Sequence, residues 1–280
     1  MRQFGISTHL YHSARLGRDH LIEIGGYGFE SIELFATRTH FDYHNTSAAA
    51  DLQQWLAEAG LHLHSIHAPI TLSLVGDRWG PALTLASPDP DARALALSES
   101  IAALHVARRI PFDVLVVHLG LPRSQQPQPS DNNRDAARRS IDELQRAAGP
   151  LGVRIAVEVI PNDLSRAESL VYLVEEVLEE TGVGICLDFG HAHMDGDVVD
   201  AVETVSEHLI ATHVNDNRGR TDDHLVPFDG TIDWASVLTA VQKVGFEGTL
   251  LFELAAHGSP KETLRKARAA RERFDALLAD

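Results

Sequence analysis

The chain has 280 residues, of which 44% are hydrophobic, and a formal net charge of −16 at neutral pH. That length and apolar content suffice for one large core or for two domains of ordinary size, and no linker-like stretch separates two cores. A protein that grips long stretches of nucleic-acid backbone normally has a basic surface, so the charge argues against such a partner, although it leaves room for a local basic groove.

Short β-like runs alternate with segments of helical periodicity along the chain. We expect strands at 3–8, 30–35, 61–68, 113–120, 154–160, 183–189, 209–215 and 248–254. We expect helices at 15–25, 47–59, 91–109, 132–148, 165–181, 197–206, 233–244 and 260–278. Strict alternation of this kind indicates right-handed βαβ units and a parallel sheet.

Eight strand–helix repeats in about 250 residues match the size and count of a closed barrel. We therefore predict an α/β fold, a single (β/α)8 TIM barrel that spans residues 1–280 as one domain. A doubly wound open sheet is the competing interpretation, but it rarely has eight regular repeats, and no glycine-rich GxGxxG turn follows the first predicted strand.

The sequence also bears on the compartment. No apolar run reaches membrane-spanning length, and the N-terminus lacks the basic-then-apolar pattern of a signal peptide. The single cysteine, Cys186, cannot form an internal disulfide, which fits a reducing environment. We expect a cytoplasmic protein with no membrane partner, either a monomer or a homodimer.

Two connections, 71–90 and 121–133, are unusually long. Both follow predicted strands, so in a barrel both lie at the C-terminal end, where long loops usually cover a functional site. We expect these loops to select the substrate. For the aromatic residues Trp79 and Phe228, we expect packing rather than contact with a ligand.

Six consecutive predicted strands carry an imidazole or a carboxylate near their C-terminal ends, which in a barrel form one ring around one mouth. These residues are His67, His118, Glu158, Asp188, His213 and Glu253. The residues two positions earlier are mostly small or compact, so we expect them to form an inward layer beneath the six. That layer is Ser65, Val116, Ala156, Cys186, Ala211 and Leu251.

Three carboxylates in one barrel mouth would repel one another, and a divalent cation removes this problem. Glu158, Asp188, His213 and Glu253 together suit Mn²⁺ or Mg²⁺, and also Zn²⁺ or Co²⁺. Further histidines shift the preference toward Zn²⁺ or another transition metal. One of these is His191, which we expect in the loop after Asp188, turned back toward the same mouth; we expect the nearby His193 and Asp195 to be exposed.

Several motifs resemble the xylose-isomerase-like barrel superfamily, which holds sugar isomerases and epimerases, inosose dehydratases and the endonuclease IV group. The resemblance covers nearly the whole chain and is specific for the superfamily but not for a substrate. The segments that carry it are HAP (67–69), VVHLG (116–120), VEVI (157–160), CLDFGHAH (186–193), THVNDN (212–217), DDHLVPFDGTIDW (222–234) and LLFEL (250–254).

The resemblance implies a set of metal ligands. Superfamily members with one metal hold it with a Glu, Asp, His, Glu set, which maps onto Glu158, Asp188, His213 and Glu253. Endonuclease IV holds three zinc ions with nine ligands, and by that resemblance two further groups would each hold an ion. These groups are His67 and His118 with Glu158, and His191 with Asp222 and His224. We therefore expect one to three divalent ions per chain.

The acidic charge and the segment GTIDW (230–234), which is similar to the sugar-epimerase branch, favour sugar chemistry. We predict a metal-dependent isomerase or epimerase that acts on a keto sugar, a sugar phosphate or an inosose. Two carboxylates, Glu158 and Glu253, would move the proton. The substrate would be held by His9, Glu33, His191, Arg218 and Arg220.

Two other functions stay open. Simple epimerases often lack the pair His67 and His118, so a multinuclear phosphoesterase of the endonuclease IV type, acting on a phosphodiester or on abasic-site DNA, is the alternative. A non-catalytic sugar- or metal-binding barrel is the least favoured, because loss of activity more often shows as a lost ligand and none is lost here.

Overall fold

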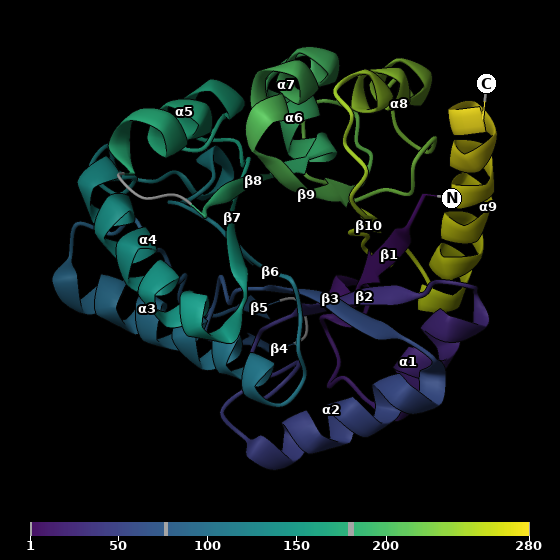
Figure 1. Ribbon diagram of the computed structural model, residues 1–280, viewed down its shortest axis with the longest axis horizontal. Helices are drawn as coiled ribbons and strands as arrows, with labels where there is room; N and C mark the ends of the chain where they lie inside the picture. The colour runs from purple at the N-terminus through teal and green to yellow at the C-terminus, as the bar shows by residue number, and fades with distance from the viewer. Residues whose placement is uncertain (1, 76–77, 179–181, 280) are drawn as a thin grey trace.

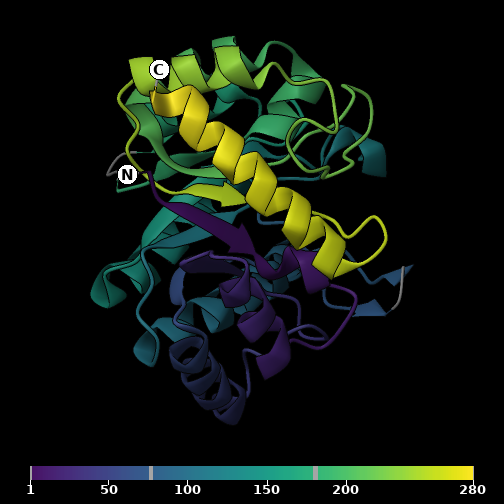
Figure 2. The same ribbon diagram turned by 90° about the vertical axis from the view of Figure 1, so that its right-hand side faces the viewer.

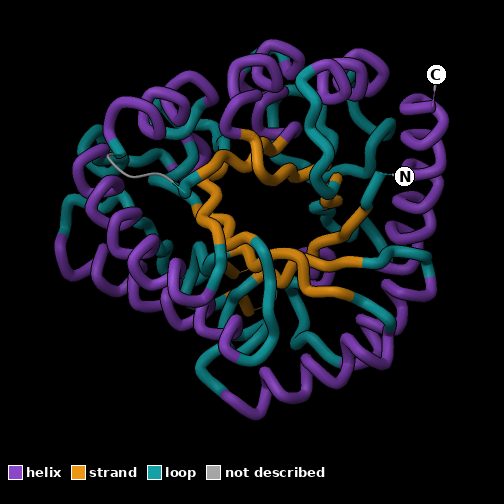
Figure 3. Tube along the Cα trace, in the orientation of Figure 1, coloured by secondary structure: helices purple, strands orange, loops and turns teal. Residues whose placement is uncertain are grey.

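The computed structural model describes residues 2–75, 78–178 and 182–279. Within these ranges, eight parallel strands close into a barrel in the order β1-β10-β9-β8-β7-β6-β3-β2, the ring at the centre of Figures 1 and 3. The predicted (β/α)8 barrel is therefore confirmed. Its strands are β1 (Phe4–Ser7), β2 (Ser31–Phe35), β3 (His62–His67), β6 (Val114–Val117), β7 (Arg154–Glu158), β8 (Gly184–Asp188), β9 (Leu209–Val214) and β10 (Leu250–Phe252).

Helices surround the strand ring (Figure 1). Several begin at an Asn or Asp whose side chain accepts hydrogen bonds from the first free N–H groups, as Asn45 and Asp89 do for α2 and α3. In the described residues, no helix is both long and apolar enough to cross a membrane. The outer helices are α1 (Arg18–Gly26), α2 (Thr46–Ala59), α3 (Pro90–Leu104), α4 (Arg134–Ala148), α5 (Ala167–Tyr172), α7 (Val198–Val205), α8 (Trp234–Lys243) and α9 (Pro260–Ala279).

The hydrophobic core has two parts. A continuous cluster extends from Phe4 to Phe274 between the strands and the helices, and Phe274 of α9 packs against Phe252 of β10 with ring centroids 5.7 Å apart. A smaller cluster lines the inside of the barrel and includes four of the six residues predicted for the inward layer. Its members are Val114, Val116, Ala156, Cys186 and Ala211. Because strand side chains alternate, the polar residues two positions later reach the mouth.

The connections differ from the prediction in three places. The helix predicted at 165–181 is shorter, because α5 ends at Tyr172 and a π-helical turn (Leu173–Val177) follows; residues 179–181 lie outside the described residues. A short helix, α6 (Phe189–Asp195), follows β8 where a loop was expected. The connection 71–90 contains an antiparallel hairpin of β4 (Leu74–Val75) and β5 (Arg78–Trp79), which projects at the edge of the molecule in Figure 2.

Short turns of 3-10 helix complete the described chain and replace parts of the predicted loops and helix ends. They are η1 (Thr8–Tyr11), η2 (His105–Arg108), η3 (Arg123–Gln125), η4 (Gly149–Leu151) and η6 (Ser206–His208). The turn η1 directly follows β1 and so brings the N-terminal histidines to the barrel mouth.

Candidate metal centre

Four ligand-type residues meet at the C-terminal end of neighbouring strands. Glu158 and Asp188 end β7 and β8, His213 lies near the end of β9, and Glu253 directly follows β10. Each is at most 3% exposed, and each offers one ligand atom within 4.8 Å of the others. The structure thus brings together the four residues that the sequence predicts as ligands of a single metal ion.

The hydrogen bonding of this group fits a metal ion. Both carboxylate oxygens of Glu158 and Nδ1 of His213 are buried and have no hydrogen-bond partner among the described residues. Nδ1 lies 3.3 Å from Glu158 and 3.2 Å from Glu253, so the atoms are close but are not aligned as donors and acceptors. Buried polar atoms are normally satisfied, and atoms that converge without hydrogen bonds are what a divalent cation requires.

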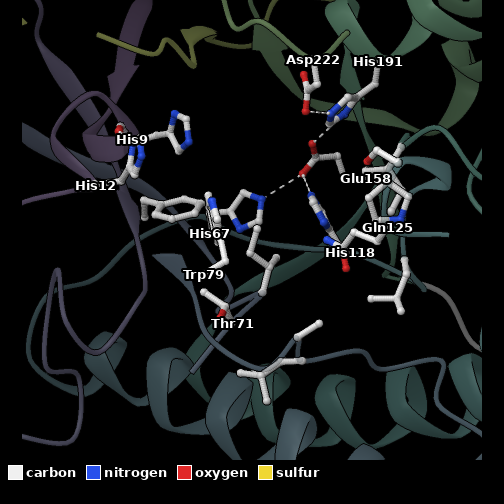
Figure 4. A pocket seen from close by; sticks show the side chains of 18 of the residues that line it. His9, His12, His67, Thr71, Trp79, His118, Gln125, Glu158, His191 and Asp222 are labelled. Carbon is white, nitrogen blue, oxygen red and sulfur yellow. Dashed lines mark hydrogen bonds and ion pairs between the residues drawn. The ribbon is translucent and has the colours of Figure 1, made fainter. Parts of the chain in front are cut away.

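Two further groups adjoin this one; Figure 4 shows His67 and His118 beside Glu158, and His191 beside Asp222. His67 Nε2 and His118 Nε2 each lie 3.2 Å from Oε2 of Glu158. On the other side, Asp222 lies 3.0 Å from His191 Nε2 and 3.3 Å from His224 Nε2. Both trios have ligand atoms within 4.8 Å of one another. The first trio shares Glu158 with the central group, and His191 Nδ1 of the second lies 3.4 Å from Glu158, so all nine candidate ligands lie in one connected cluster.

Backbone carbonyls orient three of the imidazoles. Nδ1 of His67 lies 2.8 Å from the Ala68 carbonyl, and Nδ1 of His191 lies 3.0 Å from the Val159 carbonyl. His224 Nδ1 lies 3.0 Å from the carbonyl of Glu253. A carbonyl only accepts, so in each ring Nδ1 carries a proton and Nε2 is the nitrogen turned toward the centre, where it can bind a metal ion once it is deprotonated.

The position of His191 depends on helix α6. Asp188 caps this helix, because its Oδ1 accepts a 2.7 Å hydrogen bond from the His191 backbone N–H, while Oδ2 accepts one of 2.7 Å from Asn215. Gly190 leaves no room for a Cβ against the Asn215 side chain, so the first turn of α6 packs directly on the end of β9. His191 was expected in a loop; it lies instead in the first turn of a helix, yet it reaches the same mouth.

The loop after β9 carries Asp222 and His224. Asp216 organises this loop, since its carboxylate accepts hydrogen bonds from the Trp234 indole at 2.9 Å and from the Phe228 backbone N–H at 3.0 Å. His224 has φ of +45°, an unusual conformation for a non-glycine residue, and the surrounding contacts hold it there. Phe228 packs against the core, as predicted.

A cavity of about 510 Å³ opens above the ligands, within the range of about 300–1,000 Å³ typical of small-molecule sites. Both long connections contribute to its wall, through Trp79 from one and Gln125 from the other (Figure 4). None of the described residues that line it is Lys or Arg.

Only some of the residues predicted to hold the substrate line the cavity. His9 lines the cavity, with Nδ1 3.1 Å from the Leu254 carbonyl, and His191 lines it too. Arg218 and Arg220 are exposed and are not among the described residues that line the cavity, so their predicted contact with the substrate gains no support from the structure. Glu33 is fully buried beneath the ligands, where it contacts His213 and Ser65 instead of the cavity.

Sequence reasoning missed several residues of the cavity. His12 and Phe35 line it, and so does Trp79, for which packing was expected; its side chain is 51% exposed, and its ring lies 6.0 Å from that of His12. His12 directly follows η1, three residues after His9, and their rings stack at 4.5 Å. The spacing of these two histidines after a barrel strand was the available signal.

The ionisable groups affect one another strongly. Burial opposes ionisation of Glu158, but His213 and His118 hold its pKa well below the ordinary value. Burial raises the pKa of Glu253, and the charge of Glu158 adds to this effect. For His67, burial is outweighed by Glu158, which raises the pKa to about 9. The two glutamates therefore differ in their affinity for a proton, as an acid and a base on one site would.

The chain is similar in sequence to a family model and to several known proteins. A family model described as xylose isomerase-like TIM barrel matches residues 23–277. The chain is 28% identical to an uncharacterised protein of Sinorhizobium fredii, over 71% of this chain and 68% of that protein. It is 26% identical to a probable endonuclease 4 of Malacoplasma penetrans (66% and 71%) and 22% identical to a D-psicose 3-epimerase of Enterocloster bolteae (84% and 76%).

Solved structures share the whole fold. A D-tagatose 3-epimerase-like protein superposes with a TM-score of 0.80 at 23% identity, covering 100% of this chain and 97% of that one. The IOLI protein, described with a zinc atom, gives a TM-score of 0.77 at 17% identity and covers 98% of each chain. At these identities the likeness concerns the fold, while the family match spans nearly the whole sequence. The chain belongs to the xylose isomerase-like TIM barrel family.

Proposed function

We propose that this protein is a divalent-metal-dependent isomerase or epimerase of an uncharged keto sugar or inosose. The observation that carries the proposal is the buried group of Glu158, Asp188, His213 and Glu253 at the floor of a cavity of small-molecule size, in which both oxygens of Glu158 and Nδ1 of His213 have no hydrogen-bond partner among the described residues. These four residues would hold the metal, which can be Zn²⁺, Mn²⁺, Mg²⁺ or Co²⁺.

When bound, the metal would polarise the substrate carbonyl and so acidify the adjacent C–H bond. Glu158 ends β7 and Glu253 directly follows β10, and the strands β8 and β9 lie between them in the ring. Glu158, held ionised by its histidine neighbours, removes the proton from the carbon next to the carbonyl. Glu253 returns a proton, on the opposite face for an epimerase or to the adjacent atom for an isomerase.

The imidazoles position the substrate. His9, whose Nδ1 faces a backbone carbonyl, turns Nε2 to the cavity as an acceptor for a substrate hydroxyl. Burial, together with the neighbouring His224 and His12, holds the pKa of His9 well below the ordinary value, so this ring stays neutral. His191 and His224 line the same cavity and supply further contacts to hydroxyl oxygens.

The cavity wall favours an uncharged substrate. Phosphate groups are usually met by Arg, Lys or a glycine-rich cradle, and no described residue of the lining is Arg or Lys. The names of relatives agree with sugar chemistry, since the Enterocloster bolteae protein is a D-psicose 3-epimerase and a Bacillus licheniformis relative is an inosose isomerase.

Solvent exchange tests the proposal whichever product is formed. The metal-supplemented protein is incubated in D₂O with a panel of free ketoses, sugar phosphates and inososes, and deuterium incorporation next to the carbonyl is followed by NMR. We expect exchange with at least one uncharged substrate, and none with Glu158→Gln. No exchange with any member of the panel, under metal supplementation, would count against the proposal.

A second candidate function is a multinuclear phosphoesterase. The observation that favours it is the completeness of the two additional trios, which a single-metal enzyme does not require. The similarity to a protein named probable endonuclease 4 also supports the phosphoesterase function. Hydrolysis of a chromogenic phosphodiester and of abasic-site DNA, at rates that saturate only above one metal equivalent per chain, would favour this function over sugar chemistry.

A further inference from the structure

The imidazole of His213 is oriented in the opposite sense to those of His67, His191 and His224. Those rings are held through Nδ1 by backbone carbonyls and present Nε2 to the centre. His213 presents Nδ1, which lies 3.3 Å from Glu158 and 3.2 Å from Glu253. Its Nε2 makes a 3.1 Å hydrogen bond with Oε2 of Glu33, so a carboxylate takes the place of a carbonyl.

Glu33 has no visible role apart from this contact. It lies on β2, is 0% exposed, and does not line the cavity. Its Oε2 also accepts a 2.9 Å hydrogen bond from the Ser65 hydroxyl on the paired strand β3, and its Oε1 has no hydrogen-bond partner among the described residues. Burying a carboxylate in a barrel is costly, so a residue of similar volume without a charge would serve packing better.

We propose that Glu33 is the positioning residue for His213. A neutral imidazole carries one proton, and the carboxylate of Glu33 keeps that proton on Nε2. Nδ1 is thereby left with a lone pair directed at Glu158, Asp188 and Glu253, where the ion would bind. The hydrogen bond also fixes the ring orientation and increases the basicity of the ligand, as a carboxylate behind a metal-bound histidine does. Ser65 in turn fixes the carboxylate. The inference rests on the proposed metal centre.

The first test measures Zn²⁺ affinity by competition with a chromophoric chelator. Glu33→Leu should bind Zn²⁺ about 10- to 100-fold more weakly than the wild type. Glu33→Gln keeps an acceptor for the Nε2 proton and should recover part of the loss. The matched control is Glu99→Leu, which removes another buried carboxylate that contacts a histidine, His44, at 3.1 Å outside the site; it should leave Zn²⁺ affinity unchanged.

The second test observes the tautomer directly. In the zinc-loaded protein with ¹⁵N-labelled histidine, we expect His213 to show a solvent-protected proton on Nε2 and none on Nδ1. Glu33→Leu should lose that protection, and Ser65→Ala should weaken it with a smaller loss of affinity. If Glu33→Leu does not fold, Glu33→Gln and Ser65→Ala still test the contact.

The outcomes separate this inference from the proposed function. A wild-type protein that binds no Zn²⁺ would overturn both. A wild type that binds Zn²⁺, with Glu33 variants that match its affinity and its Nε2 protection, would overturn the role of Glu33 alone. An affinity loss in Glu99→Leu equal to that in Glu33→Leu would also overturn it, since the effect would then be a general loss of stability.

Discussion

His191 Nε2 lies 3.0 Å from Oδ2 of Asp222, a contact that joins the first turn of α6 to the loop after β9. The other oxygen of Asp222 lies 3.3 Å from Nε2 of His224. Burial opposes protonation of His224, but Asp222 outweighs it and raises the pKa of His224 to about 10.

This relationship predicts the effect of removing one charge. In the metal-free protein, Asp222→Asn should lower the pKa of His224 by more than about one unit, because the main charge that stabilises the imidazolium is lost while burial remains. An NMR titration of the histidine ring protons measures it. A His224 that keeps its high pKa in Asp222→Asn would show that other carboxylates, such as Glu253, supply the effect.

Glu158 is the residue on which turnover should depend most. Glu158→Gln keeps the size of the side chain but removes both the charge for the metal and the base, so kcat should fall by at least about 100-fold. Steady-state rates on the substrate found by solvent exchange would measure this. The matched control is Glu99→Gln, another buried glutamate, which should keep kcat within about twofold. Near-normal turnover in Glu158→Gln would remove Glu158 from the proton-transfer role.

Trp79 should affect the binding of substrate and not the chemical step. Its ring is half exposed at the cavity edge, so Trp79→Ala should leave stability within about 0.5 kcal/mol. KM should rise about 3- to 10-fold, as the loss of one aromatic contact implies. Tyr172→Ala, which removes an exposed aromatic ring from α5 away from the cavity, serves as the control. An unchanged KM in Trp79→Ala would mean that the hairpin does not touch the substrate.

His40 should make the stability of the fold depend on pH. It is fully buried, and burial lowers its pKa to about 4, whereas an unfolded histidine titrates near 6.5. Between these values the unfolded chain binds a proton that the folded chain does not, so stability falls as the pH drops from about 6.5 to 4, by up to about 3 kcal/mol.

Urea unfolding across this range, in His40→Gln and in the wild type, measures the contribution of His40. The variant should show a smaller loss of stability between pH 6.5 and 4, whatever its absolute stability. His62→Gln, which removes an exposed imidazole at the start of β3, should follow the wild type. Parallel curves for His40→Gln and the wild type would contradict the assignment.

The barrel and its ring of ligands are predictable from sequence because both follow from strand periodicity. Carboxylates such as Glu158 and Asp188 stand in otherwise apolar runs, and a period of two places them one layer above Ala156 and Cys186. That argument needs only the strands and their common direction, so it does not depend on how the loops fold.

The connections depend on contacts between distant residues, and the sequence predicts them less well. Helix α6 contains Gly190, which lowers its helix propensity, and its N-cap, Asp188, is predicted from the sequence only as a metal ligand. Arg218 is exposed, in a loop that a hydrogen bond from the Trp234 indole on α8 to Asp216 holds in place. The hairpin that carries Trp79 cannot be predicted from the local sequence, because its strands β4 and β5 have only two residues each.

The most direct test of the metal-dependent sugar isomerase or epimerase is metal stoichiometry, combined with activity. Protein purified without chelators or metal-affinity resin is assayed by elemental analysis, stripped, and titrated with Mn²⁺, Co²⁺, Mg²⁺ or Zn²⁺ while solvent exchange into a ketose or inosose is followed. We predict that exchange reaches its maximum at one equivalent per chain and that Glu158→Gln neither retains the metal nor recovers activity. Full exchange without metal would contradict the account. So would two to three tightly held equivalents of zinc or iron with phosphodiester hydrolysis and no exchange.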